Sequence, residues 1–156
     1  MMMKPVVQLE VTGCAIASVG ALAGISYAKA KSAANSLGIH ADDSALWSDT
    51  RHMRKLLAHF GFVGSPTERP FRSWTSLPDR ALLSIKWHLE RGRPCWHWVV
   101  FAREGGYAFV LDSKKSLRNH RRTDFGRMKP KWFISVTDIG RRADRSGINP
   151  TRVNDS

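Results

Sequence analysis

Apolar residues follow a helical period in the first part of the chain and a strand-like pattern in the second. Before Gly61 they recur at three- and four-residue spacing, which predicts helices over residues 14–23, 27–37 and 51–60. The first of these is almost entirely apolar or small, as is typical of a helix buried on every side. The other two have one apolar stripe each, so we expect each to pack one face against a core.

The chain beyond residue 61 is rich in aromatic and β-branched residues. This composition predicts strands over residues 80–87, 95–103, 107–111 and 131–137. The first of these is also compatible with a short helix, although a strand is favoured. Gly105 and Gly106 form the expected hairpin turn between the second and third strands. Helices followed by antiparallel strands indicate an α+β fold with segregated layers.

The domain organisation follows from length and from the polar C-terminal end. The 156 residues suit one domain with one hydrophobic core. We expect that domain to span residues 1–138. Residues 139–156 are polar and contain Gly, Asn and Pro, which predicts a flexible tail.

The chain is strongly basic. Its formal net charge is +12, which favours anionic partners such as nucleic acid, an anionic membrane surface or an acidic protein. Much of the charge lies in a basic loop that begins at Lys114 and ends at Lys131 and includes the run 118–122. This loop is either a solvated surface or a patch for an anionic partner. The chain has no motif that reads nucleic-acid bases.

Cysteine content and hydropathy indicate in which cellular compartment the protein is expected. Two cysteines are too few for a disulfide framework, so we expect a cytoplasmic protein. Residues 14–30 loosely imitate a signal peptide and residues 11–14 a lipoprotein cleavage box, but Gln8 and Glu10 interrupt the apolar region that either would need. Secretion is therefore the lesser alternative. The longest apolar run is too short to span a bilayer, so no integral membrane segment is expected.

The candidate chemistry centres on Cys14, at the head of the buried helix. Helix N-termini stabilise a thiolate through unpaired N–H groups and the helix dipole. His97 and Asp112 lie on the two strands that flank the glycine turn, offset by two positions and therefore within diagonal reach. They supply a base and a group that orients it. The Gln8 side-chain amide and the Cys14 backbone N–H are candidate oxyanion donors.

Gln8, Cys14, His97 and Asp112 occur in the order of papain-like cysteine peptidases. The runs HWVVF at 97–101 and YAFVLD at 107–112 resemble more specifically the C39 peptidase-like group, which includes bacterial peptidases that cleave leader peptides after a double glycine. The resemblance covers residues 5–112. It implies a papain-like fold, with a helical part that holds a buried nucleophile helix against a C-terminal antiparallel sheet.

The resemblance also implies a role for each residue. Cys14 is the nucleophile, His97 the general base, Asp112 the orienting residue and Gln8 the oxyanion donor, and no cofactor or metal is required. The chain departs from the group at three positions, each next to a candidate catalytic residue. Gly13 and Ala15 stand where the group usually has Asp and Gly, and Ser113 stands where it usually has Pro.

Two other interpretations of these residues stay open. A cysteine before an apolar helix is often only a small buried side chain, so the chain is alternatively a catalytically inactive papain-like module that binds an acidic protein or nucleic acid. Cys95 lies two residues before His97, on the same face of the expected strand. With His88 and His97, Cys95 suggests a metal site, but the spacing provides no ordered set of ligands.

Overall fold

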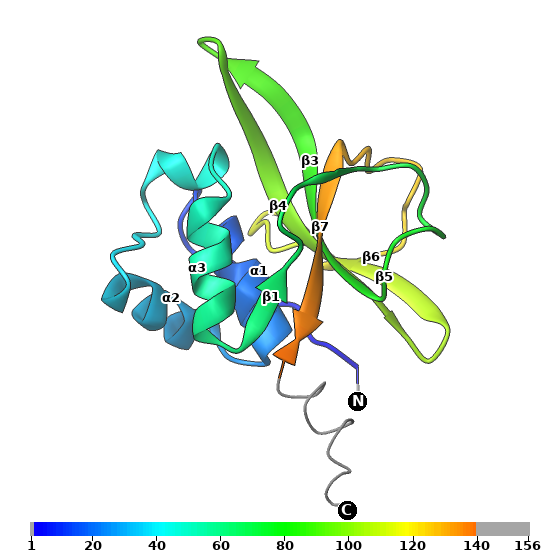
Figure 1. Cartoon of the computed structure of the whole chain (residues 1–156), viewed down its shortest axis with the longest axis horizontal. Coiled ribbons are helices and arrows are strands. Elements are labelled where there is room, and N and C mark those ends of the chain that lie inside the picture. Colours follow the sequence, from blue (N-terminus) through cyan, green and yellow to red (C-terminus); the bar gives the residue numbers. More distant parts are fainter. Residues whose placement is uncertain (1, 140–156) are drawn as a thin grey trace, which may run out of the picture.

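Three α-helices pack beside a seven-stranded antiparallel sheet in the computed structural model, which describes residues 2–139 (Figure 1). The α+β class is therefore confirmed. The strand order is β1-β7-β3-β4-β5-β6, and β2 pairs with β7 off this path. The expected polar tail lies outside the described residues except for Ile139.

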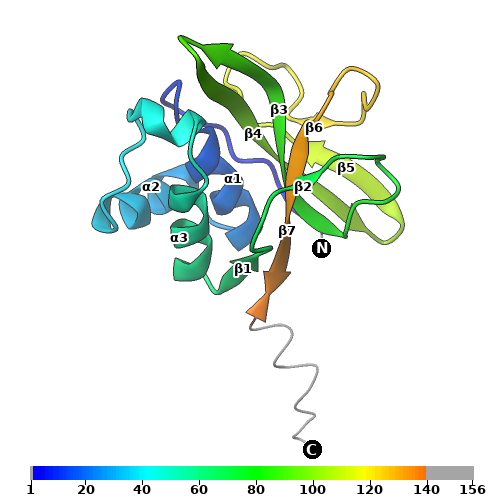
Figure 2. The same cartoon turned by 45° about the horizontal axis from the view of Figure 1, so that its top comes forward.

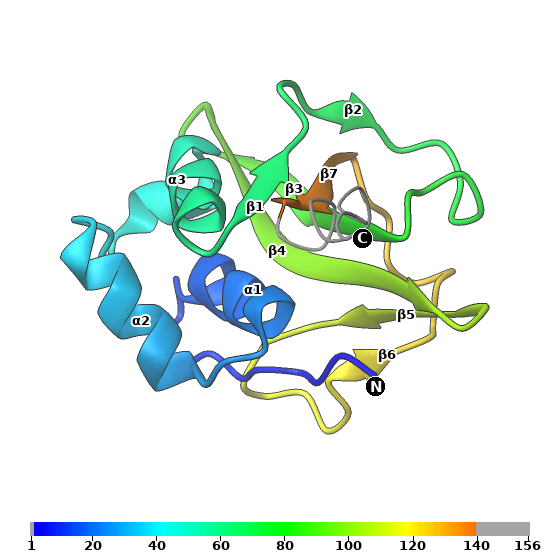
Figure 3. The ribbon, with the colours of Figure 1, turned by 60° about the horizontal axis from the view of Figure 1, so that its bottom comes forward.

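Helix α1 (Cys14–Ala23) is the central helix of the fold. Its residues from Cys14 to Leu22 are all buried, as the uniformly apolar sequence predicts. It lies between the sheet and helices α2 (Tyr27–Ser36) and α3 (Arg51–His59) (Figure 3). It ends at Gly24, whose φ of 71° is left-handed. A side chain at Gly20 would meet Ala30 at 3.2 Å, so glycine lets α2 approach closely.

The other helices begin where their capping residues predict. The Ser26 hydroxyl accepts the Lys29 backbone N–H at 3.2 Å at the start of α2. At the start of α3, the Asp49 carboxylate accepts the Arg51 N–H at 2.8 Å, while Thr50 occupies the cap position without a side-chain bond. A short 3₁₀-helix, η1 (Ser44–Trp47), was not expected from the sequence.

The strands largely follow the predicted pattern. Strand β3 (Arg80–Glu90) confirms the preference for a strand over a helix and extends beyond the expected end, as does β4 (Arg93–Glu104). The turn between them is therefore shorter than expected. The remaining strands are β5 (Tyr107–Leu111), β7 (Trp132–Asp138) and the short β1 (Phe62–Gly64), β2 (Arg69–Pro70) and β6 (Arg121–Arg122).

Both faces of the sheet are covered by apolar side chains. Along β4, Trp98 and Val100 belong to the core shared with the helices. The alternate residues Val99 and Phe101 belong to a second core, closed by loop residues such as Leu77 and by side chains of neighbouring strands. A central strand buried on both faces explains why β4 is continuously apolar in sequence.

The β3–β4 hairpin extends well beyond the neighbouring strands (Figures 1 and 2). Its pairing slips between Ile85 and His88, where Lys86 adopts a positive φ of 55°. Such a bulge redirects side chains locally. On the other side of β4, pairing with β5 stops at Val100↔Leu111, immediately before Asp112. The candidate site lies at this end of the sheet.

Candidate active site

His97 and Asp112 are joined by a short hydrogen bond. The His97 Nε2 atom lies 2.7 Å from the Asp112 Oδ1 atom. The His97 side chain is 14% exposed and that of Asp112 is 0% exposed. The offset across the glycine hairpin therefore brings this pair together as the sequence suggested.

Two further groups hold the Asp112 carboxylate. The Lys114 backbone N–H donates to its Oδ1 at 3.1 Å, and the Arg122 guanidinium donates to its Oδ2 at 2.9 Å. Burial alone raises the pKa of Asp112, but the hydrogen bonds and charge of these partners and His97 outweigh it and lower that pKa to about 2. Asp112 is therefore an anion at neutral pH.

His97 also interacts with Cys14. Burial lowers the pKa of His97, but its hydrogen bond to Asp112, the charge of Asp112 and its interaction with the nearby Cys14 side chain raise it to about 9. Because Asp112 occupies Nε2, Nδ1 is the ring nitrogen left for the thiol. Cys14 thus lies beside the hydrogen-bonded pair of His97 and Asp112, in which His97 favours the imidazolium form.

Cys14 is the first residue of α1, and it has no exposed surface. The N-cap residue, Gly13, has no side chain to bond the first-turn N–H groups, and the first bond within the helix runs from Ala17 N–H to Gly13 O at 3.0 Å. The initial N–H groups of a helix have no partner within it. The thiol is therefore beside donors that stabilise a negative charge.

The glycine at position 13 is explained by its neighbours. A Cβ atom there would collide with the Tyr27 hydroxyl and lie 3.2 Å from the Glu10 carbonyl oxygen. The Tyr27 hydroxyl is fixed, because it donates to the Glu10 carboxylate at 2.5 Å. Lys31 Nζ donates to the other carboxylate oxygen at 2.5 Å. An aspartate, usual here in the C39 group, would not fit this arrangement.

Gln8 lies beside the site with its amide already hydrogen-bonded. Its Nε2 atom donates to the carbonyl oxygens of Glu10 and Val11, both at 2.9 Å. Its Oε1 atom accepts the Ser113 hydroxyl at 2.6 Å, and its backbone N–H donates to the Ser113 carbonyl at 3.0 Å. Gln8 thus connects the loop before Cys14 to the residue after Asp112. A role as oxyanion donor requires the amide to exchange one of these partners.

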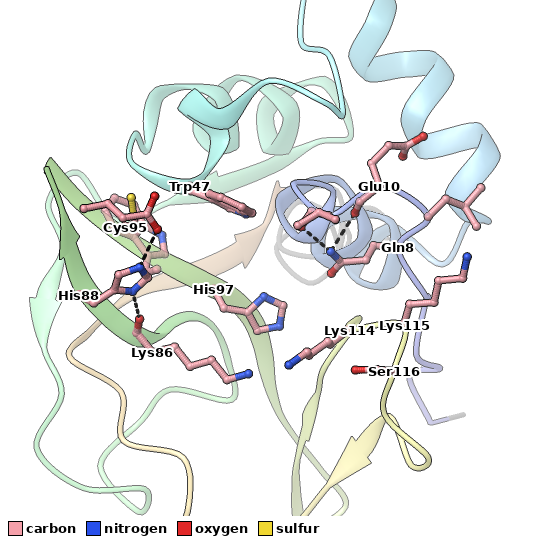
Figure 4. A pocket seen from close by; sticks show the side chains of 14 residues that line it. Gln8, Glu10, Trp47, Lys86, His88, Cys95, His97, Lys114, Lys115 and Ser116 are labelled. Atoms are coloured by element: carbon pink, nitrogen blue, oxygen red, sulfur yellow. Dashed lines mark hydrogen bonds and ion pairs between the residues drawn. The ribbon is translucent and has the colours of Figure 1, made fainter.

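An open groove of about 370 Å³ lies over the site (Figure 4). His97 and Gln8 line it, whereas Cys14 and Asp112 lie beneath its surface. Its other walls include Trp47 and Trp96 and the long side chains of Lys86, Lys114 and Lys115. Glu10 and Glu90 also line it, but each already has a partner, Lys31 and His88 respectively. The groove therefore combines apolar walls with lysines that have no such partner among residues 2–139.

A second cluster in the same groove has potential metal ligands. Ligand atoms of His88, Glu90 and Cys95 lie within 4.8 Å of one another. His88 is already paired, because Nδ1 lies 2.8 Å from the Lys86 carbonyl oxygen and Nε2 lies 3.0 Å from Glu90 Oε2. These two contacts raise the pKa of His88. The exposed contact between His88 and Glu90 accounts for the arrangement, although the three side chains have donor types that could hold a divalent cation.

Two arginines of the basic run, Arg121 and Arg122, bind other groups within the protein, which the sequence did not indicate. Arg122 binds Asp112 and also Asp124, with Nη2 2.7 Å from Asp124 Oδ2. Arg121 donates to the Met3 carbonyl oxygen, and its guanidinium lies over the Phe109 ring at 5.0 Å. These two arginines stabilise the fold and the site, which leaves the rest of the loop as the basic surface.

No family model matches the chain, and neither does any curated protein sequence. Among residues 2–139, no helix combines the length and the apolar character needed to cross a membrane. The functional assignment therefore depends on the arrangement of side chains around Cys14.

Proposed function

We propose that the protein is a papain-like cysteine peptidase that hydrolyses a peptide or isopeptide bond. The observation that carries this proposal is the position of Cys14, at the start of α1, beside the hydrogen-bonded pair of His97 and Asp112. A thiol at a helix N-terminus, a histidine with a raised pKa and a buried carboxylate are the components of an ion-pair nucleophile.

The first half of the reaction forms a thioester. The Cys14 thiolate attacks the carbonyl carbon, and the carbonyl oxygen takes the negative charge. The Cys14 backbone N–H is a donor for this oxyanion, and Gln8 stays a predicted second donor. As the tetrahedral intermediate collapses, the His97 imidazolium gives its proton to the leaving nitrogen and the C–N bond breaks, which releases an amine.

The second half restores the enzyme. Neutral His97 accepts a proton from water, whose oxygen attacks the thioester carbonyl. The C–S bond then breaks, which releases a carboxylic acid and regenerates the Cys14 thiolate beside the imidazolium. Asp112 remains ionised throughout and holds the His97 ring through Nε2. If an amine takes the place of water, the same steps transfer the acyl group.

Selective alkylation tests the nucleophile without knowledge of the substrate. We expect substoichiometric iodoacetamide at neutral pH to label Cys14 before Cys95, and His97→Gln to slow labelling of Cys14 only. Incubation with a cellular peptide mixture should yield new N-termini that are missing with Cys14→Ala. If Cys95 is labelled first and the peptide mixture is unchanged, the peptidase proposal is wrong.

The burial of the thiol favours an alternative function, that of an inactive binding module. Cys14 has no exposed surface, so a substrate reaches it only after the cover above it moves. A module that does not turn over substrate needs no such movement. Retention on an anionic resin that is unchanged by Cys14→Ala, together with an unreactive Cys14, is the result this alternative predicts.

A further inference from the structure

Two lysines from different parts of the chain meet in the groove beside His97. Lys86 comes from β3 and Lys114 from the segment after β5, and Figure 4 shows their ammonium groups directed toward one another. Burial and then the proximity of Lys114 lower the pKa of Lys86. Like charges held this close repel unless an anion lies between them.

The backbone directs both side chains toward this point. Lys86 occupies the bulge of β3 with a φ of 55°, a conformation that costs energy for a residue other than glycine. Lys114 is fixed by its own N–H, which donates to the Asp112 carboxylate at 3.1 Å. The position of Lys114 is thus tied to that of the residue that orients His97.

Neither ammonium group forms an ion pair within residues 2–139. The nearby carboxylate, Asp112, is already bonded to His97 and Arg122. Lys115 adds a third cation to the lining of the groove. The groove therefore offers unpaired positive charge next to the candidate catalytic histidine.

We propose that Lys86 and Lys114 form a subsite for a carboxylate of the peptide substrate. This inference rests on the proposed peptidase function and names the substrate class, a peptide with a carboxylate close to the scissile bond. Peptides carry this group on Asp and Glu side chains and at the C-terminus, and both are recognised by the same pair of ammonium groups. Binding also removes the repulsion between the two lysines.

Peptide binding to the Cys14→Ala variant separates this subsite from catalysis. Three probes are titrated at constant salt and followed through backbone amide shifts: acetyl-Ala-Glu-Ala-amide, acetyl-Ala-Gln-Ala-amide, and acetyl-Ala-Gln-Ala with a free C-terminus. We expect at least one carboxylate peptide to bind about tenfold more tightly than the neutral one, with the largest shifts around Lys86 and Lys114. Tighter binding of the first probe assigns the carboxylate to a side chain, and tighter binding of the third probe assigns it to the chain end.

Charge-matched variants make the test specific in a basic protein. Lys86→Met and Lys114→Met should each remove most of the preference, whereas Lys29→Met, on the exposed face of α2, removes the same charge and should keep it. Equal affinities for all three peptides, or a preference that survives in both groove variants, overturns the subsite. If the preference holds but Cys14 of the unmodified protein is unreactive, the peptidase function fails and the carboxylate site stands.

Discussion

Arg122 donates to the Asp112 oxygen that faces away from His97, at 2.9 Å. One carboxylate thus connects the candidate catalytic histidine to a cation ten residues farther along the chain. Asp124 holds the same guanidinium from its other side at 2.7 Å. Arg122 thereby keeps Asp112 charged and oriented without contact with a substrate, which makes it a positioning residue.

Replacement of Arg122 by Met should weaken the site and the fold together. It leaves Asp112 with one uncompensated buried oxygen, so we expect a loss of about 1–3 kcal/mol in unfolding free energy. The pKa of Asp112 should rise from about 2 toward its ordinary value. Denaturant unfolding and a carboxyl titration by NMR measure the two effects. Arg118→Met in the exposed part of the same loop is the matched control, and equal effects of both variants would contradict the role of Arg122.

His97 predicts how stability and activity depend on pH. Its pKa in the folded protein, about 9, is raised above the ordinary 6.5, so its contribution is complete below about pH 6.5 and is lost as pH rises through about 9. Turnover that needs the imidazolium as a proton donor to the leaving nitrogen should decline over the same alkaline range. Unfolding curves and cleavage rates on the peptide mixture between pH 6 and 10 measure this, with His97→Gln as control. A wild-type profile that is flat up to pH 10 would contradict the ion pair.

The sequence predicted those parts of the site that depend on local pattern. The apolar run after Cys14 indicated a buried helix, and the glycine turn set the register that brings His97 to Asp112. Both conclusions depend only on periodicity and on counting residues across one hairpin. They therefore needed no knowledge of distant parts of the chain.

Other features depend on tertiary contacts and had no local signal. Strand β1 pairs with β7, which lies about half the length of the chain away in sequence, and its three residues look like a loop in sequence. The bulge at Lys86 interrupts a regular apolar pattern without Gly or Pro to mark it. Arg122 reads as one of several basic residues, since only the fold shows that it meets Asp112. Such pairings are decided by packing rather than by propensity.

Gly13 should tolerate no side chain while Tyr27 has its hydroxyl. We expect Gly13→Ala to lower the unfolding free energy by about 1–3 kcal/mol, because the new methyl group collides with that hydroxyl. Combination with Tyr27→Phe should recover part of the loss, so the two substitutions are not additive. Thermal or denaturant unfolding of the four proteins in this cycle gives the coupling. Gly126→Ala, where nothing lies within 4 Å of the added carbon, is the control, and full additivity would contradict the proposed clash.

Glu10 should control access to the thiol. Its carboxylate anchors the loop before Cys14 through Tyr27 and Lys31, and the thiol has no exposed surface while that loop is in place. Because Cys14 reacts only from an opened form, Glu10→Gln should raise its alkylation rate by about threefold, in keeping with the loss of one surface ion pair. Iodoacetamide labelling followed by mass spectrometry in a Cys95→Ala background measures this rate. Glu68→Gln breaks a comparable ion pair, to Arg54, and should leave the rate unchanged. An unchanged or slower rate in Glu10→Gln would show that the cover over Cys14 is held by other contacts.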